Sequence, residues 1–291
     1  MAGLKEVRIR IASVKSTQQI TSAMKMVSAS KLKRAQRAIT KMRPYSGKLK
    51  EILENLSSSL SNSENVYSTN RKVKNVLIIA VTSNRGLCGA FNSNVIKETN
   101  NIIQNKYAEL AKSNNVEIMC IGKKGADYFT KRKYNVAESN INIFDSLNFD
   151  NAAPIAEKIM KAFADGTYDK IEIVYNQFKN AAVHILTSEQ FLPITQSKLT
   201  NDKTVSDYIF EPEKEKIVSE LIPKSLKIQF YKILLDSNAA EHGARMTAMH
   251  KATDNADALI KELRLNYNKA RQASITNEIL EIVSGAEALK G

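Results

Sequence analysis

Residues 4–60 read LKEVRIRIASVKSTQQITSAMKMVSASKLKRAQRAITKMRPYSGKLKEILENLSSSL, and two rows of residues repeat through this stretch every seven positions. The first row consists of Leu4, Ile11, Gln18, Lys25, Leu32, Ile39, Ser46, Leu53 and Leu60. The second row consists of Val7, Val14, Thr21, Ser28, Ala35, Met42, Leu49 and Leu56. Both rows are apolar at their ends and polar near the middle. Apolar rows sustained at this spacing predict a coiled-coil helix, in which Pro44 either causes a kink or is absorbed by a local irregularity.

The last fifty residues repeat the pattern and predict a second helix. One row consists of Met246, Thr253, Ile260, Tyr267 and Ser274, and the other consists of Met249, Ala256, Leu263, Ala270 and Asn277. Many positions in this stretch are alanine, which lets two helices approach closely. We expect Pro223 in the first turn of this helix, where a missing N–H costs nothing. A short helix is expected to open at Glu211-Pro212-Glu213.

The residues between the two helices predict strands that alternate with helices. Strands are expected at Val73–Val81, Val116–Ile121, Lys170–Tyr175 and His184–Leu192. Helices are expected at Asn92–Ala111, Lys123–Lys131 and Asn151–Ala164. This alternation predicts a parallel sheet and an α/β fold class. The expected domains are an N-terminal coiled-coil helix at 1–60, an α/β domain at 73–211 and a C-terminal coiled-coil helix at 212–291.

The positive charge of the chain is concentrated at its start. The formal net charge is +13, and residues 1–50 carry thirteen Lys and Arg against one acid, Glu6. A helix with one sign of charge favours an anionic partner: nucleic acid, a membrane surface or an acidic protein. A nucleic-acid binder usually interleaves aromatic residues, and Tyr45 is the only one in residues 1–50. An acidic protein groove is therefore favoured, with a basic coiled-coil nucleic-acid protein as the alternative.

Local motifs give no catalytic, cofactor or metal site. Gly86-Leu87-Cys88-Gly89 lacks the Gly-Lys-Ser/Thr ending of a nucleotide loop, so a tight strand-to-helix turn is the better interpretation. Gly122-Lys123-Lys124-Gly125 is interpreted in the same way. The two cysteines, Cys88 and Cys120, match no metal or redox spacing and are expected to be buried thiols. His242 and His250 are too far apart along a helix to share a metal ion.

The sequence also bears on the compartment. The longest apolar run, Val76–Val81, is far too short to span a bilayer. The first residues carry neither an apolar signal region nor a Ser/Arg-rich transit stretch. We therefore expect a cytoplasm-like compartment.

Three stretches resemble one family, the gamma subunits of F-type (rotary) ATP synthases. These are residues 2–31, residues 82–92 (TSNRGLCGAFN) and residues 267–286 (YNKARQASITNEILEIVSGA), of which the last is the most specific. The resemblance covers nearly the whole chain and is weakest at 113–150 and 195–235. It implies an antiparallel coiled coil of the N- and C-terminal helices with an inserted Rossmann-like α/β domain. The inserted dithiol of the plant form is absent, so the chain resembles the bacterial type.

The resemblance also implies a role. The family's gamma subunit is a non-catalytic shaft, without cofactor, that couples ion-driven rotation to ATP synthesis at the cytoplasmic face of the bacterial membrane. The implied partners are the head of three alpha and three beta subunits, the epsilon subunit and the c-subunit ring, and not nucleic acid.

Residue roles are implied by the same resemblance. An acidic lever loop of the beta subunits would meet a basic stripe that includes Lys25, Lys31, Lys33 and Arg34. Polar contacts with a beta subunit would come from Arg271, Gln272, Thr276 and Glu278. Three further positions would contact the beta subunits and affect the coupling of rotation to catalysis: Met24, Arg245 and Glu281. An apolar tail would turn in the collar at the top of the head: Ile279, Leu280, Ile282 and Val283.

Overall fold

The structure is a computed structural model that describes residues 4–57, 66–69, 71–194 and 214–288 of the 291-residue chain. The chain divides into two compact units. One combines Met1–Ser28 with Met246–Gly291, and the other comprises Ala29–Arg245. Two helices contribute to both units: α1 (Leu4–Ser57) and α6 (Lys214–Ala288).

Both long helices continue through a proline. Pro44 lies inside α1, so the predicted helix is unbroken there. Pro223 also lies inside α6, nine residues after its first residue, so the expectation that Pro223 occupies the first turn is wrong. The flanking residues Ile222 and Leu226 are 6% and 3% exposed and belong to the core of the second unit. Their burial offsets the hydrogen bond that proline removes. The expected helix start at Glu211–Glu213 lies outside the described residues.

The unit Ala29–Arg245 is built on a five-stranded sheet with strand order β3-β2-β1-β4-β5. The strands are β1 (Val76–Val81), β2 (Val116–Ile121), β3 (Val136–Asn140), β4 (Lys170–Phe178) and β5 (His184–Leu192). The first four strands are parallel, and β5 pairs antiparallel with β4. The α/β class is confirmed, while the expectation of a parallel sheet omitted the antiparallel edge strand and missed β3.

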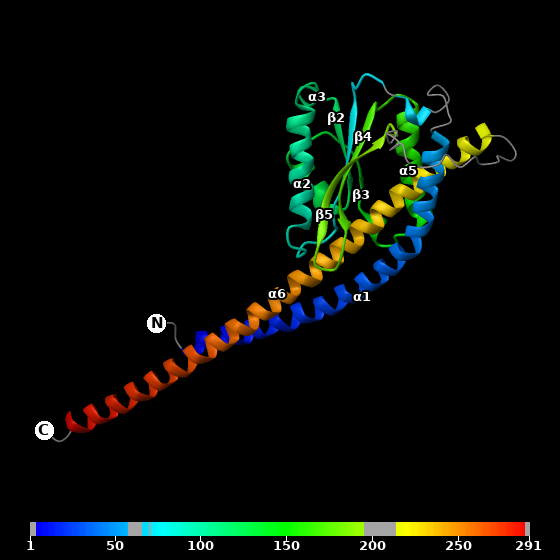
Figure 1. The fold of residues 1–291 in the computed structure, drawn as a ribbon. Helices are drawn as coiled ribbons and strands as arrows, with labels where there is room; N and C mark the ends of the chain where they lie inside the picture. The colour runs from blue at the N-terminus through cyan, green and yellow to red at the C-terminus, as the bar shows by residue number, and fades with distance from the viewer. Residues whose placement is uncertain (1–3, 58–65, 70, 195–213, 289–291) are drawn as a thin grey trace. The chain divides into compact units, whose positions relative to one another are not determined.

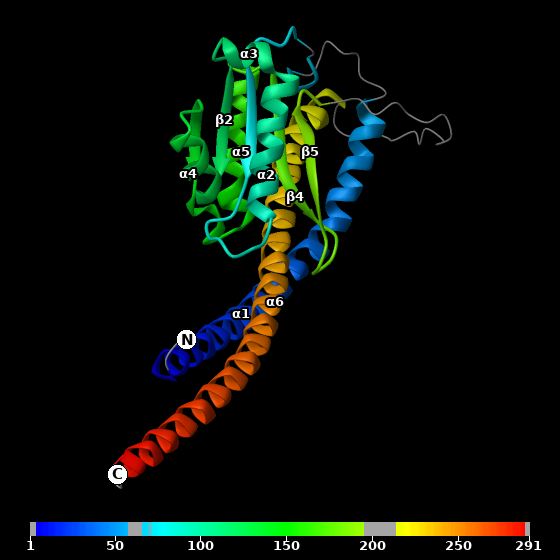
Figure 2. The same cartoon turned by 90° about the vertical axis from the view of Figure 1, so that its left-hand side faces the viewer.

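The sheet lies between two helical layers (Figure 1 and Figure 2). On one face, Ile78, Ala80 and Cys120 pack with α2 (Phe91–Asn101) and α4 (Lys123–Lys131). On the other face, Leu77 and Ile173 pack with α5 (Phe149–Ala164) and residues 222–234 of α6. Every residue of β1 is buried because both faces of this central strand are covered.

Helix positions follow local signals in the sequence. Asn148 caps α5, and its side-chain oxygen accepts a hydrogen bond from the Asn151 amide at 2.8 Å. The helix expected at Asn92–Ala111 is divided into α2, a π-helical turn at Ile102–Lys106 and α3 (Ala108–Lys112). Short 3-10 turns lie at Val66–Ser68 and Asn142–Phe144.

Several positions of the heptad rows are buried in the two long helices. In α1, Thr21, Ser28, Leu32, Ala35, Ile39 and Leu49 are buried. In α6, Met249, Ala256, Ile260 and Leu263 are buried. This burial confirms the predicted rows at these positions, because a heptad repeat keeps one stripe of a helix against its neighbour. Asn277 is exposed, and the side chains of Ser46, Leu53, Leu56 and Leu60 lie outside the described residues.

Candidate functional site

The unit formed by the two chain ends is an antiparallel helix pair. Gln18 Nε2 of α1 donates to Asp257 Oδ1 of α6 at 2.6 Å, and Thr21 Oγ1 lies 2.9 Å from Thr253 Oγ1. As the residue number rises from 18 to 21 on α1, it falls from 257 to 253 on α6. The polar centre of the heptad rows therefore pairs with polar residues across the seam.

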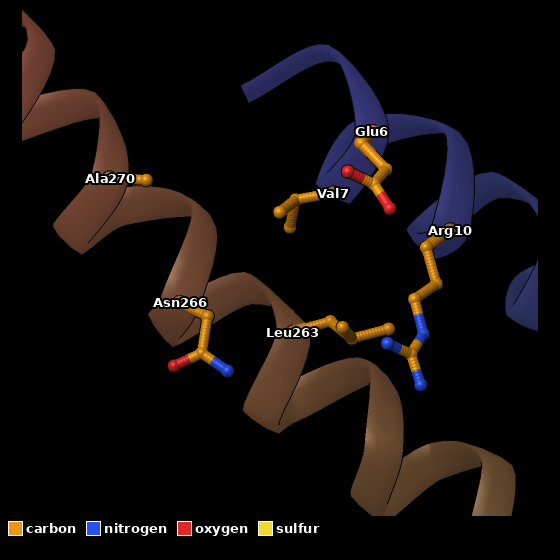
Figure 3. Close-up of a pocket in the computed structure, with 6 residues that line it drawn as sticks. All are labelled: Glu6, Val7, Arg10, Leu263, Asn266 and Ala270. Atoms are coloured by element: carbon orange, nitrogen blue, oxygen red, sulfur yellow. The ribbon is translucent and has the colours of Figure 1, made fainter. Parts of the chain in front are cut away.

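Nearer the chain ends the same two helices enclose a shallow hollow. Figure 3 shows Val7 and Arg10 of α1 opposite Leu263, Asn266 and Ala270 of α6, with Glu6 at the edge. Its lining combines apolar groups with one acid and one base, and these give no cluster of catalytic groups. The hollow is a gap in helix packing.

The end of α6 is uncovered. Every residue from Ile275 to Ala288 is exposed. This segment includes all four residues expected in the collar, at 51–71% exposure: Ile279, Leu280, Ile282 and Val283. Large apolar side chains gathered on an exposed helix are one feature of surfaces that bind other proteins.

The polar residues predicted on the same segment are also exposed. They are Arg271, Gln272, Thr276, Glu278 and Glu281. Gln272, Thr276, Ile279 and Val283 follow each other at helical spacing, so they share one face. The Thr276 hydroxyl donates to the Gln272 carbonyl at 2.9 Å, and Ser274 donates to Glu278 Oε1 at 3.3 Å. The charged and amide groups of Arg271 and Gln272 face solvent.

The predicted residues of α1 differ in exposure. Met24 and Lys25, in the unit of the chain ends, are half-buried. In the other unit, Lys31, Lys33 and Arg34 are exposed. The positive charge of Lys31 acts on two buried groups of α6: it helps to lower the pKa of His242, and it opposes the rise that burial causes in the pKa of Glu241. The structure therefore gathers Lys31 with Glu241 and His242, and with Arg245 beside them.

Arg245 is buried within its own chain, at 7% exposure. Its Nη1 donates to Glu241 Oε1 at 2.6 Å, and its Nη2 donates to the Arg85 carbonyl at 3.0 Å. Burial raises the pKa of Glu241, and the Arg245 guanidinium opposes that rise. Burial and the charges of Arg245 and Lys31 lower the pKa of His242 to about 4, so this imidazole is neutral at pH 7.

Sequence reasoning did not identify the partners of Arg245. Glu241 stands four residues before it on α6, which is the spacing of a helical ion pair and was the available signal. The carbonyls of Arg85 and Gly86 belong to the turn after β1, and no local pattern connects that turn with α6. The exposed side chain of Leu87, in the same turn, was also not singled out.

The two glycine motifs form turns. Leu87 and Gly89 have positive φ values of 62° and 59° after β1. Gly122 has a φ of 96°, and a Cβ built there would lie 2.1 Å from the Thr82 carbonyl oxygen. The space into which a side chain at Gly122 would project is thus filled by the backbone of Thr82. This confirms the interpretation of both motifs as tight turns.

Other reactive groups are enclosed. Cys88 and Cys120 are buried free thiols, as predicted, and burial raises the pKa of Cys120 to about 12. Among the described residues no group of His, Cys, Asp and Glu could hold a metal ion. None of the helices in the described ranges is long and apolar enough to cross a bilayer.

The similarity to known proteins covers nearly the whole chain. The family model described as "ATP synthase" matches residues 3–289. The "ATP synthase gamma chain" of Cytophaga hutchinsonii is 57% identical over 293 residues, covering 99% of both chains. This chain belongs to the ATP synthase gamma chain family. A gamma chain from Flavobacterium johnsoniae is 59% identical over the full length of both chains, and one from Chlorobaculum tepidum is 48% identical over the same extent.

Solved structures share the gamma chain fold. The central stalk and c-ring structure of the Tetrahymena thermophila mitochondrial ATP synthase contains a chain that is 25% identical, with a TM-score of 0.62. It matches 80% of this chain and 99% of its own length. A chain of the Euglena gracilis mitochondrial ATP synthase is 21% identical, with a TM-score of 0.71, and matches 98% of this chain and 94% of its own length. The α/β sheet with its two long terminal helices is thus the gamma chain fold.

Proposed function

We propose that this chain is the central rotor shaft of a bacterial F-type ATP synthase. It couples ion-driven rotation of a c-subunit ring to ATP synthesis in a head of three alpha and three beta subunits, or the reverse. It carries no active site of its own and works at the cytoplasmic face of the membrane, with the epsilon subunit as a further partner. In this proposal residues 1–60 and 212–291 form the shaft, and residues 73–211 form the domain at its foot.

One observation carries the proposal: the exposed apolar end of α6 in a member of the gamma chain family. Every residue from Ile275 to Ala288 is exposed, although this part of the helix carries large apolar side chains. Such a segment needs an external surface that excludes water. A smooth apolar collar satisfies this need and still permits turning, because non-directional apolar contacts impose no fixed angle.

A shaft can drive catalysis because each beta subunit contacts a different side of it. Three beta subunits of one sequence hold different conformations at one moment if each meets a different side of the shaft. A contact shifts a conformational equilibrium only by the difference in its free energy between the two states. Moving one site from about 1:99 to 99:1 requires roughly 5.5 kcal/mol of such difference. Rotation presents these differences to the three subunits in turn.

The basic stripe supplies contacts suited to sliding. Lys31, Lys33 and Arg34 are exposed, and Lys25 is half-buried. Exposed charge attracts an acidic loop over a Debye length of about 8 Å without interlocking with it. Polar contacts from Arg271, Gln272, Thr276 and Glu278 then mark particular angles, while Met24 and Glu281 adjust the coupling. Arg245 acts from inside the chain, through the contacts described above.

The test is charge reversal in the assembled head. Changing Lys31, Lys33 and Arg34 together to Glu should lower the torque and alter the ATPase rate of a reconstituted head, because the stripe then repels an acidic loop. The matched control changes Lys72, Lys74 and Lys112 to Glu, since these exposed lysines give the same change in charge elsewhere in the Ala29–Arg245 unit. Equal torque in the stripe variant, the control and the unmodified head would remove the electrostatic part of the proposal.

Two further observations test the assignment as a whole. The purified chain alone should hydrolyse no ATP, and it should co-purify with a larger ATPase from native membranes. A basic coiled-coil nucleic-acid protein would instead bind DNA tightly without sequence preference, with an affinity that falls steeply with salt. That binding, combined with no co-purifying ATPase, would replace the rotor proposal.

A further inference from the structure

The outward face of α1 in the unit of Met1–Ser28 and Met246–Gly291 carries no charged residue over most of its length. Six exposed residues follow one another there at steps of four and three: Ile9, Ser13, Ser16, Ile20, Ala23 and Val27. At about 100° per residue they lie within about 80° of one another around the helix axis, on the side away from the seam rows. Figure 3 shows the seam side, where Val7 of α1 and Leu263 of α6 point into the space between the helices. The uncharged face extends over about 27 Å.

This lack of charge is unusual for the segment in which it occurs. Residues 1–50 carry thirteen Lys and Arg, and within residues 9–27 the cations are Arg10, Lys15 and Lys25. Each of these three lies about 100° or more around the helix from the centre of the uncharged face. The outer face of a helix in water normally carries charged and polar side chains. Here large aliphatic side chains stand 57–61% exposed instead: Ile9, Ile20 and Val27.

The matching face of α6 in the same unit has a different character. Its six exposed positions follow the same steps and also lie away from the seam rows: Lys251, Asn255, Ala258, Glu262, Leu265 and Lys269. Three of these six residues are charged, as expected for a helix face in contact with water. The two outward faces of the helix pair therefore have equal geometry and unequal chemistry, because only the α6 face is charged.

We propose that the uncharged α1 face, from Ile9 to Val27, binds an apolar and uncharged surface on the inner wall of the catalytic head. The inference rests on the proposed rotor function and names one of the unequal sides that this function requires. Large aliphatic side chains held in solvent gain free energy when a partner removes them from water. Because such contacts are non-directional, the partner surface can also slide over the face as the shaft turns.

Charge and width select this partner over two others. An acidic loop finds no cation on the uncharged α1 face, whereas the exposed residues Lys31, Lys33 and Arg34 offer three. A helix that lies in a membrane surface requires a broad apolar face, and Ser13 and Ser16 interrupt this one. A head subunit that meets this face at one angle and the charged α6 face at another experiences two different contacts. That difference in free energy is what can shift its conformation.

The test places one new charge on each outward face. Ala23→Lys changes an exposed alanine of the uncharged α1 face, and Ala258→Lys makes the same change at an exposed alanine of the α6 face. The two variants are matched because they have the same net charge and the same change in helix propensity. Ile20→Ser removes an apolar side chain without adding charge, with Ile20→Val as its conservative control. The readouts are the affinity of each chain for a head of three alpha and three beta subunits and the thermal unfolding midpoint of each chain.

Ala23→Lys should weaken binding to the head by about tenfold or more, because the new charge is buried there without a partner. Ala258→Lys should change the affinity by no more than about twofold. Ile20→Ser should weaken binding about fivefold, and Ile20→Val should stay within about twofold of the unmodified chain. All four variants should unfold close to the midpoint of the unmodified chain, because the three positions are exposed.

A reporter of polarity gives a second readout. Cys88 and Cys120 are buried, so a cysteine introduced at position 23 or 258 can be labelled selectively. The emission of a polarity-sensitive dye on Ala23→Cys should shift to shorter wavelength when the chain assembles with a head. The same dye on Ala258→Cys should keep the emission that it has in water.

Other results overturn the inference. Equal binding by Ala23→Lys and Ala258→Lys, to a head in which the unmodified chain assembles and rotates, would mean that the uncharged α1 face binds no apolar wall, while the rotor function still stands. A lower unfolding midpoint for Ala23→Lys alone would mean that the chain covers this face itself. Dimers of the purified chain, or its binding to anionic lipid vesicles, would assign the face to a second copy or a membrane if Ala23→Lys but not Ala258→Lys abolished them. If the unmodified chain does not assemble with a head, the rotor proposal itself fails, which is a distinct result.

Discussion

Gly122 offers a direct check of the turn that joins β2 to α4. Gly122→Ala places a Cβ 2.1 Å from the Thr82 carbonyl oxygen and 2.7 Å from its carbonyl carbon, and both atoms are backbone. The φ of 96° lies in a region that alanine rarely adopts. Enforcing this backbone costs about 1–3 kcal/mol. Displacing the end of β1 costs about 1–3 kcal/mol more. We therefore expect the α/β unit to lose roughly 2–6 kcal/mol of stability.

The assay is native-state amide hydrogen exchange of β1 and β2, which reports the opening free energy of this sheet. Two other glycines serve as controls. Gly89→Ala meets no atom within 4 Å but has a φ of 59°, so strain alone should cost about 1–2 kcal/mol. Gly47→Ala lies in α1 with open space and should stabilise the helix by about 0.5–1 kcal/mol. If Gly122→Ala costs no more than Gly89→Ala, the close approach to Thr82 is not enforced and the reasoning is refuted.

Three further substitutions test the packing and electrostatics. Thr21→Val or Thr253→Val alone should cost about 0.5–1.5 kcal/mol, and the double variant should be nearly neutral, which a double-mutant cycle of unfolding free energies measures. Ala256→Leu should overpack the helix seam and cost about 1–3 kcal/mol in thermal or urea unfolding, whereas an unchanged midpoint would contradict close packing there. Burial opposes ionisation of Glu172, but hydrogen bonds from Lys106 and Tyr107 and nearby positive charge outweigh it and lower its pKa below 4.5. The ionised Glu172 therefore stabilises the fold above about pH 4.5, and this stabilisation is lost as the pH falls through its lowered folded-state pKa. In Glu172→Gln, the free energy of unfolding should depend less on pH in this acidic range.

The sequence predicted those helices and strands in which the spacing of apolar residues along the chain matches the residues that are buried in the fold. The heptad rows of α1 and α6 could be predicted because a seam repeats every seven residues wherever two helices wind together. The bounds of β2, α4 and β5 agree with the predicted ones, because Gly122 separates β2 from α4 and Pro193 directly follows β5. β3 was missed because Val136–Asn140 is an edge strand of alternating half-buried residues with few apolar side chains.

What could not be predicted depends on contacts between distant segments. The direction of β5 depends on a short hairpin to β4, and a strand's apolar pattern has no direction. Pro223 was assigned to a helix start from its local preference, but packing of Ile222 and Leu226 on the sheet carries α6 through it. Arg245 was placed at a partner surface by resemblance, whereas its hydrogen bonds reach the turn about 160 residues earlier. Hydrogen bonds between such distant segments produce no recognisable residue pattern in the sequence.

The central claim is that the two chain ends form a shaft that turns inside a catalytic head. The most direct measurement attaches a bead to this chain in an immobilised head of three alpha and three beta subunits and follows its angle after ATP is added. The account predicts one-way rotation that pauses every third of a turn, with a rate that follows ATP hydrolysis. Sustained hydrolysis by a head that contains this chain, with the bead stationary or moving at random, would contradict it.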